Sequence, residues 1–172
     1  CSTGMATEEE IKESIAVLKR STAQFILLHC NSTYPAPFKD VNLNYISQLR
    51  NLSDGFVGYS GHERGIAVTL AAVGLGAKVV ERHFTFDRNM EGPDHAASLV
   101  PDEFRALVAG IREIEDALGD GLSRTISQGE MINRENLAKS LVVSRYLKKE
   151  ALIKQLDIKV RSLRQRFSLQ KF

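Results

Sequence analysis

The 172-residue sequence has a globular composition, with 43% hydrophobic residues, 26% charged residues and a net charge of +2, which argues against extended disorder. Its longest apolar stretch, residues 66–80, is interrupted by glycines and a lysine. It falls short of the about 20 apolar residues that cross a bilayer, so no membrane segment is expected. Two cysteines are too few for a disulfide framework, and a cytoplasmic location is expected. The four basic residues after position 160 are too few to predict nucleic-acid binding.

The chain begins with alternating helix and strand patterns. Thr7 and Glu10 form a capping-box pair ahead of apolar residues at helical spacing, which predicts a helix over residues 8–20. The continuous apolar run at 24–30 predicts a parallel strand that is covered on both faces. By the same criteria the sequence predicts a short helix at 43–49, a strand at 56–59, a buried helix at 66–75 and a strand at 77–86.

A long helix is expected to open at Pro101. Proline is favoured at the first helical position, and the acidic Asp102 and Glu103 suit the positive end of the helix dipole. Strands and helices that alternate with short connections form right-handed βαβ units, so residues 1–120 are predicted to be α/β with a parallel sheet. Because we count only three full strands, we expect a partial TIM (β/α) barrel rather than a closed barrel of eight strands.

The remainder of the chain reads as a second, smaller unit. A polar, glycine-rich stretch predicts a linker over residues 121–135. Beyond it, the patterns at 139–143 and 158–160 predict short strands of a unit that spans 136–160.

The histidines gather where barrel enzymes place their sites. All four lie between positions 29 and 95, and three of them follow or end a predicted strand. Alternation in the third strand puts Glu81 and His83 on one face and Arg82 on the other, and both faces are expected to be buried. Buried charges are costly unless paired or ligated. Glu81 and Arg82 therefore either pair with neighbouring helices or belong to a functional site. His83 is either a core histidine whose hydrogen bonds are made within the protein or a ligand.

His62 favours the ligand interpretation, because it follows the strand that precedes His83 in the chain. Adjacent parallel strands lie about 4.8 Å apart, so the two imidazoles can converge on one ion. Two nitrogen ligands leave positions open for water and substrate oxygens, which suits a Lewis-acid metal such as manganese, iron or zinc. The spacing does not choose among these metals.

Three loops add polar groups at the same rim, and each has a plainer interpretation. Residues 2–5 offer hydroxyls and backbone N–H groups to an anion, or form an ordinary turn. Residues 31–35 offer hydroxyls and an aromatic ring to a sugar, or are an ordinary loop. Residues 92–98 form a polar turn that can simply lead into the next helix. Cys30 is expected to be a buried small hydrophobe rather than a nucleophile.

Five segments of the sequence match one enzyme family in the same order and with matching separations: STGMAT at 2–7, HCNSTYPAP at 29–37, GYSGHE at 58–63, ERHFTFDR at 81–88 and GPDHAAS at 92–98. The sequence therefore closely resembles the sialic acid synthases, including the legionaminic and pseudaminic acid synthases. The resemblance covers about residues 1–160. It implies the last third or so of the family's barrel, followed by the beginning of a C-terminal antifreeze-like domain.

The resemblance implies roles for seven residues. His62 and His83 are expected to ligate a divalent metal, with Mn²⁺ as the expected ion, and to be the catalytic residues. The residues near the phosphate or carboxylate of phosphoenolpyruvate are then Ser2 and Ser60, and those that meet an N-acyl amino sugar are Tyr34 and Asp94. Ser32 stands where some relatives carry Asn, so the resemblance implies its ligand contact less firmly.

The resemblance also implies a reaction, in which phosphoenolpyruvate condenses with N-acetylmannosamine or a related N-acyl amino sugar and phosphate is released. The full-length family forms homodimers. The family's catalytic glutamate and phosphate-binding lysines come from early strands that precede this sequence, so we expect a fragment that is inactive in isolation. Residues 161–172 are expected to be foreign to the family and to pack against nothing. The alternatives are a phosphoenolpyruvate-dependent synthase for another sugar and an inert truncated remnant.

Overall fold

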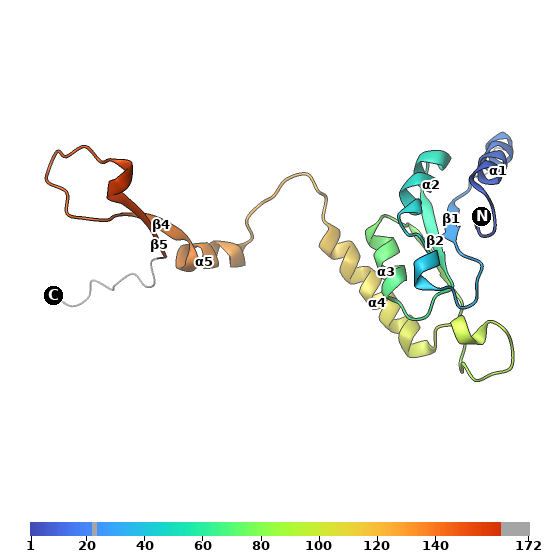
Figure 1. Cartoon of the computed structure of the whole chain (residues 1–172). Helices are drawn as coiled ribbons and strands as arrows, with labels where there is room; N and C mark the ends of the chain where they lie inside the picture. The colour runs from blue at the N-terminus through green and yellow to red at the C-terminus, as the bar shows by residue number, and fades with distance from the viewer. Residues whose placement is uncertain (22–23, 163–172) are drawn as a thin grey trace. The chain divides into compact units, whose positions relative to one another are not determined.

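The computed structural model describes residues 1–21 and 24–162, so most of the expectation for residues 161–172 lies outside the described residues. For its first two residues the expectation is wrong, because Arg161 and Ser162 pair with Ser140 and Lys139 in an antiparallel ladder. The chain divides into two compact units, Cys1–Asp120 and the part from Gly121 on (Figure 1). No helix in the described ranges is long and apolar enough to cross a membrane.

The first unit is built on a parallel sheet. Its three strands, β1 (Leu27–Cys30), β2 (Val57–Gly61) and β3 (Val79–Arg82), are hydrogen-bonded in the order β1-β2-β3. Single bridges extend the sheet at both edges, where Ser2 pairs with Leu28 and Phe84 pairs with Leu99. The prediction of three parallel strands is confirmed, and the mixed α/β architecture is consistent with part of a (β/α) barrel.

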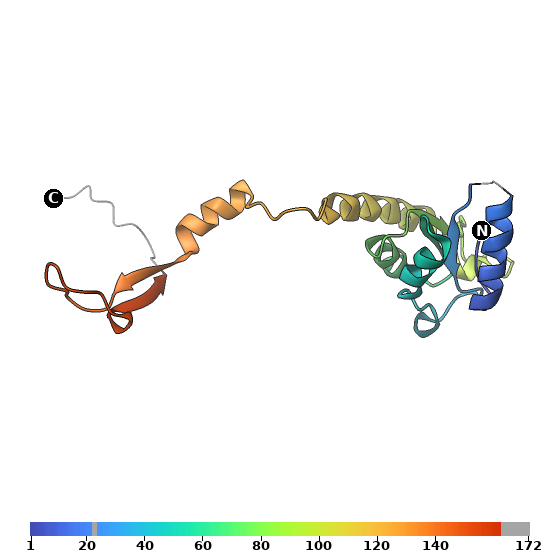
Figure 2. The ribbon, with the colours of Figure 1, turned by 90° about the horizontal axis from the view of Figure 1, so that it is seen from above.

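The helices of this unit follow the expected order. They are α1 (Glu8–Arg20), α2 (Tyr45–Ser53), α3 (Ala67–Gly74) and α4 (Pro101–Leu118), with short 3₁₀ turns at Phe38–Asp40 and His95–Ala97. The Thr7–Glu10 capping box is present at the start of α1. Helix α3 lies alongside α4, as both views of the ribbon show (Figures 1 and 2).

One face of the sheet carries the hydrophobic core. Its strand residues Leu27, Val57 and Tyr59 pack with apolar side chains from α1, α2 and α3. Within β2, alternation turns Val57 and Tyr59 to this helix-covered face, and turns Gly58 and Ser60 to the opposite face. The opposite face borders an open cavity of about 860 Å³ that Leu28, Phe56 and Val79 help to line.

The expectation that both faces of the third strand are buried is wrong. Val79 is 38% exposed and Glu81 is exposed, whereas Arg82 on the helix-covered face is buried. Among the described residues of this unit, the helices supply a core to one face only, and no helix covers the other face of β3. The strand also ends earlier than predicted, because the His83 carbonyl accepts the Leu99 N–H and the chain turns to a new neighbour.

The second unit contains α5 (Gln128–Leu137) and an antiparallel pair, β4 (Lys139–Val143) and β5 (Ile158–Ser162), with a 3₁₀ turn at Gln155–Asp157. The predicted short strands are both present. Within the predicted linker over 121–135 the structure has the start of α5, because Ser127 and Glu130 form a capping box there. The buried Asp157 accepts hydrogen bonds from Arg145 Nε at 2.5 Å and from the Lys154 N–H at 3.0 Å.

Candidate active site

His62 and His83 meet at the carboxyl end of the sheet. Gly61 and Arg82 are the last paired residues of β2 and β3, and the two histidines come immediately after them. Their ring centroids lie 5.1 Å apart, with the ring planes at 89°. The expectation that the two imidazoles share one rim is therefore confirmed.

The backbone of the neighbouring strand orients the His62 ring. Its Nδ1 lies 2.7 Å from the Asn31 carbonyl oxygen. Because a carbonyl can only accept, Nδ1 carries the proton, and the neutral ring is left with its lone pair on Nε2. The residue is 5% exposed, so the ring is held within the protein. His83 has a similar neighbour, since its Nδ1 lies 3.7 Å from Asp94 Oδ2.

This arrangement fits a metal ion that takes two nitrogens from the protein. Metal-bound histidines usually turn their second ring nitrogen to a carbonyl or carboxylate, as His62 and His83 do here. Across residues 1–21 and 24–162 no group of three or more His, Cys, Asp or Glu side chains is arranged to hold a metal. Two histidine nitrogens leave coordination positions of an ion open to further ligands such as water or substrate oxygens.

Polar and aromatic groups surround the histidine pair. The Tyr34 ring centroid lies 4.2 Å from that of His62 and 5.5 Å from that of His83. Burial raises the pKa of Tyr34, and the nearby Cys30, Asp94 and Glu81 raise it further, so the phenol stays protonated as a hydrogen-bond donor. The structure thus brings Tyr34 and Asp94 together with both histidines.

Ser60 is held beneath the pair. It is only 2% exposed, and its Oγ donates a hydrogen bond to Glu81 Oε1 at 2.7 Å. The same Oγ lies 3.4 Å from His62 Nε2. Glu81 therefore accepts the single hydroxyl proton of Ser60, so the serine does not donate a hydrogen bond to His62 Nε2.

Ser32 and Ser2 lie farther from the pair. Ser32 Oγ is 3.9 Å from Cys30 Sγ, which in turn is 3.8 Å from His62 Nδ1. Ser2 pairs with Leu28, two residues before Cys30, so it belongs to the preceding layer of the sheet. Ser32 is therefore connected to the histidine pair through Cys30. Ser2 lies beside β1, one layer of side chains before the carboxyl end of the sheet.

The other two histidines serve the fold. His29 lies on the helix-covered face, where its Nε2 donates to the Val41 carbonyl at 2.6 Å, and burial lowers its pKa. His95 Nδ1 lies 2.8 Å from Thr85 Oγ1. Neither imidazole joins the pair at the carboxyl end of the sheet.

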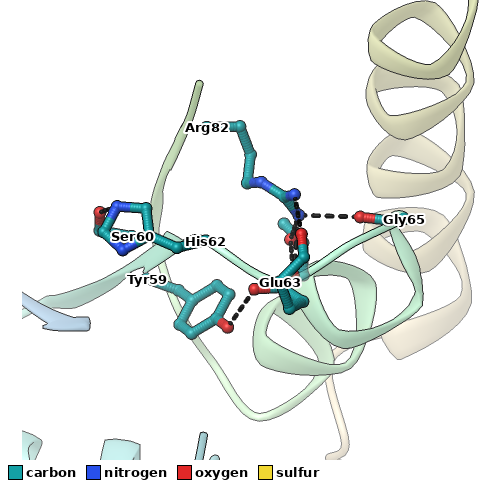
Figure 3. Close-up of polar contacts among 7 residues, drawn as sticks. Tyr59, Ser60, His62, Glu63, Gly65 and Arg82 are labelled. Atoms are coloured by element: carbon teal, nitrogen blue, oxygen red, sulfur yellow. Dashed lines mark hydrogen bonds and ion pairs between the residues drawn. The ribbon is translucent and has the colours of Figure 1, made fainter. Parts of the chain in front are cut away.

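Sequence reasoning left open the partner of Arg82, and the structure supplies it. The guanidinium forms an ion pair with Glu63 at 2.7 Å, and both side chains are 0% exposed. Tyr59 and Thr69 donate hydroxyl hydrogen bonds to the same carboxylate at 2.8 and 3.0 Å. Figure 3 shows this cluster on the other side of the strand end from the His62 ring. In the sequence, Glu63 directly follows His62 and Arg82 directly precedes His83.

Comparison with known proteins shows to which family the chain belongs. Residues 1–123 match the family model described as the NeuB family. The chain belongs to the NeuB family. This NeuB chain is 48% identical over 151 residues to the N,N'-diacetyllegionaminic acid synthase of Campylobacter jejuni, covering 86% of this chain and 45% of that relative. It is 44% identical over 142 residues to the human N-acetylneuraminate-9-phosphate synthase, covering 82% of this chain and 39% of that relative.

A solved structure agrees with the sequence relatives. The N-acetylneuraminic acid (sialic acid) synthetase of Leptospira borgpetersenii, in complex with citrate, matches the NeuB chain with a TM-score of 0.71 at 38% identity. The match covers 78% of this chain and 48% of that chain. The NeuB chain therefore spans less than half the length of each of these three relatives, and it is related to enzymes that make sialic-type sugar acids.

Proposed function

We propose that this chain is part of a synthase that condenses phosphoenolpyruvate with N-acetylmannosamine or a related N-acyl amino sugar and releases phosphate. His62 and His83 hold a divalent metal, Mn²⁺, and two of its ligands thus come from this chain. When bound, the metal supplies a Lewis acid that polarises the sugar carbonyl. The activities for which the relatives are named support the sugar-acid product class.

One observation carries the proposal. The ring centroids of His62 and His83 lie 5.1 Å apart. The Nδ1 of His62 faces the Asn31 carbonyl, and the Nδ1 of His83 faces the Asp94 carboxylate. This leaves the Nε2 atoms as the ligating nitrogens, since the second ring nitrogen of a metal-bound histidine usually faces a carbonyl or a carboxylate.

The remaining rim residues have positions suited to the substrates. Tyr34, whose ring lies against that of His62 and whose phenol stays protonated, donates to the amino sugar, and the half-exposed Asp94 accepts from the sugar hydroxyls. Ser60 turns its oxygen towards His62 and is assigned to phosphoenolpyruvate together with Ser2 on the sheet edge. Ser32 contributes through the loop beside Cys30.

The second unit is assigned to the beginning of an antifreeze-like domain, and the active form is a homodimer. The family's catalytic glutamate and phosphate-binding lysines lie in parts of the relatives that this chain does not span. The 172-residue chain alone is therefore expected to give no turnover, because positioning of both substrates supplies much of the catalysis.

The experiment combines this chain with the part of the Campylobacter jejuni relative that precedes the matched region. Mn²⁺, phosphoenolpyruvate and N-acetylmannosamine or a related N-acyl amino sugar are added, and the release of phosphate is followed. Turnover should appear only in the combination and should fall at least about 10²-fold in His62→Ala and in His83→Ala, since metal-ion stabilisation of developing charge is worth several kcal/mol. His95→Ala is the matched control and should keep the rate. Turnover that survives both substitutions at the rim would overturn the assignment.

A further inference from the structure

The distance between His62 and His83 is not set by a backbone pair. The ladder between β2 and β3 ends at Gly61 and Arg82, one residue before each histidine. Beyond that point the two chains diverge, since the His83 carbonyl accepts the Leu99 N–H and the Ala36 N–H bonds to the His62 carbonyl. Backbone bonds therefore tie each strand end to a different segment, and the β2–β3 ladder does not include the two histidines.

The Glu63–Arg82 ion pair connects the two strand ends. Glu63 directly follows His62, and Arg82 directly precedes His83. Arg82 Nη1 donates to Glu63 Oε1 at 2.7 Å and to the Gly65 carbonyl at 2.9 Å, and its Nη2 donates to the Glu63 carbonyl at 2.6 Å. A single guanidinium on β3 thus holds both the side chain and the backbone that follow His62.

The carboxylate end of the pair is fixed as firmly as the guanidinium end. Glu63 accepts from the Tyr59 hydroxyl on β2 and from the Thr69 hydroxyl on α3. Thr69 also accepts from Arg82 Nη1 at 2.7 Å. The cluster therefore ties β2, β3, the loop between them and α3 together in one buried group, and Figure 3 shows it on the other side of the strand end from the His62 ring.

Gly61 makes room for this cluster. A Cβ at position 61 would lie 2.8 Å from Tyr59 Cε1, 2.9 Å from Glu63 Oε2 and 3.0 Å from Arg82 Cδ. Those contacts are shorter than any ordinary Cβ contact, so only glycine lets the carboxylate and the guanidinium close over the strand end. The strand end is thus shaped around the ion pair.

We propose that Glu63 and Arg82 are positioning residues that set the separation and orientation of the His62 and His83 imidazoles. Alternation of side chains along the chain puts the ion pair on the helix-covered side and the imidazoles on the open side. Replacing a buried ion pair by apolar residues of similar volume is often neutral for stability, so net stability does not by itself account for this pair. The effect of the Glu63–Arg82 pair on metal affinity rests on the proposed function, whereas its effect on the geometry of the two rings does not.

The test replaces the pair by apolar residues of similar volume in the 172-residue chain, Glu63→Leu with Arg82→Met, since such replacements often preserve stability. Two quantities are measured: the nuclear Overhauser effect between the His62 and His83 ring protons without metal, and the affinity for Mn²⁺. The Overhauser effect should weaken or vanish, and the Mn²⁺ affinity should fall on the order of 10-fold, as for other outer-shell changes at metal sites.

The matched control replaces the partly exposed ion pair of Arg88 and Glu103 in the same way, Arg88→Met with Glu103→Leu. This control should leave both measurements unchanged. Tyr59→Phe is a milder variant that removes one donor to Glu63 and no charge, and it should shift both measurements in the same direction by a smaller amount.

The outcomes separate the two proposals. A folded Leu/Met variant with an unchanged Overhauser effect overturns the positioning role, whatever the metal data show. If the Leu/Met variant does not fold, an unchanged Tyr59→Phe variant overturns it as well and leaves the cluster a purely stabilising one. If the native chain binds no Mn²⁺, the metal assignment fails, and the Overhauser effect still decides the positioning role.

Discussion

Arg82→Met is expected to be among the most destabilising single substitutions in the first unit. It removes four hydrogen-bond contacts of the guanidinium and leaves the Glu63 carboxylate, which is 0% exposed, without its counter-charge. Breaking a buried ion pair by removing one partner costs about 3–5 kcal/mol. Folded domains have a total stability of about 5–15 kcal/mol, so the loss is a large part of what holds the unit together.

Arg112→Met provides the contrast. Its ion pair with Glu115 lies on the surface of α4, with side chains 71% and 51% exposed, and such pairs contribute about 0–1 kcal/mol. Urea unfolding is followed through the amide NMR signals of β2 and β3, so that the second unit does not enter the result. The Glu63→Leu, Arg82→Met double variant should recover most of the lost stability. A cost for Arg82→Met as small as that of Arg112→Met would refute the account of the buried pair.

Three further predictions concern the fold. Gly61→Ala should destabilise the first unit by about 1–3 kcal/mol in urea unfolding because its Cβ meets the Glu63–Arg82 cluster, as overpacking does. Gly74→Ala, whose Cβ meets open space at the end of α3, should instead stabilise the unit by about 0.5–1 kcal/mol. Equal effects of the two substitutions would contradict the explanation that the new Cβ lacks space at position 61. Burial lowers the pKa of His29 below its usual 6.5, so the unfolded chain binds the proton more readily and stability should fall as pH drops below about 6.5. His29→Gln should flatten that part of the pH profile, and an unchanged profile would count against a buried neutral imidazole. Ser127→Ala removes the cap of α5 and should reduce its hydrogen-exchange protection by about 1 kcal/mol, with no change in β2.

Local signals in the sequence predicted the helices and the strand order well. Thr7 with Glu10 placed the start of α1, and Pro101 placed the start of α4, because a cap depends on residues only three or four positions apart. The Ser127–Glu130 pair carries the same signal, yet residues 121–135 were predicted to be a linker. The glycine-rich composition around that pair outweighed the cap in the prediction.

Contacts between distant residues were harder to predict. The convergence of His62 and His83 followed from their positions after consecutive parallel strands, since the strand spacing is fixed. The partner of Arg82 did not follow, because Glu63 lies in the loop after β2 and its direction depends on how α3 packs. The exposure of Glu81 was likewise unpredictable, since it depends on which helices cover the sheet.

The central claim is that His62 and His83 together hold one divalent metal ion. The most direct measurement is a titration of the 172-residue chain with Mn²⁺, followed by electron paramagnetic resonance, in the native chain and in His62→Ala, His83→Ala and His95→Ala. The account predicts one Mn²⁺ per chain in the native protein and in His95→Ala, and loss of that binding in each of the other two variants. Equal binding in all four proteins, or in none of them, would contradict it.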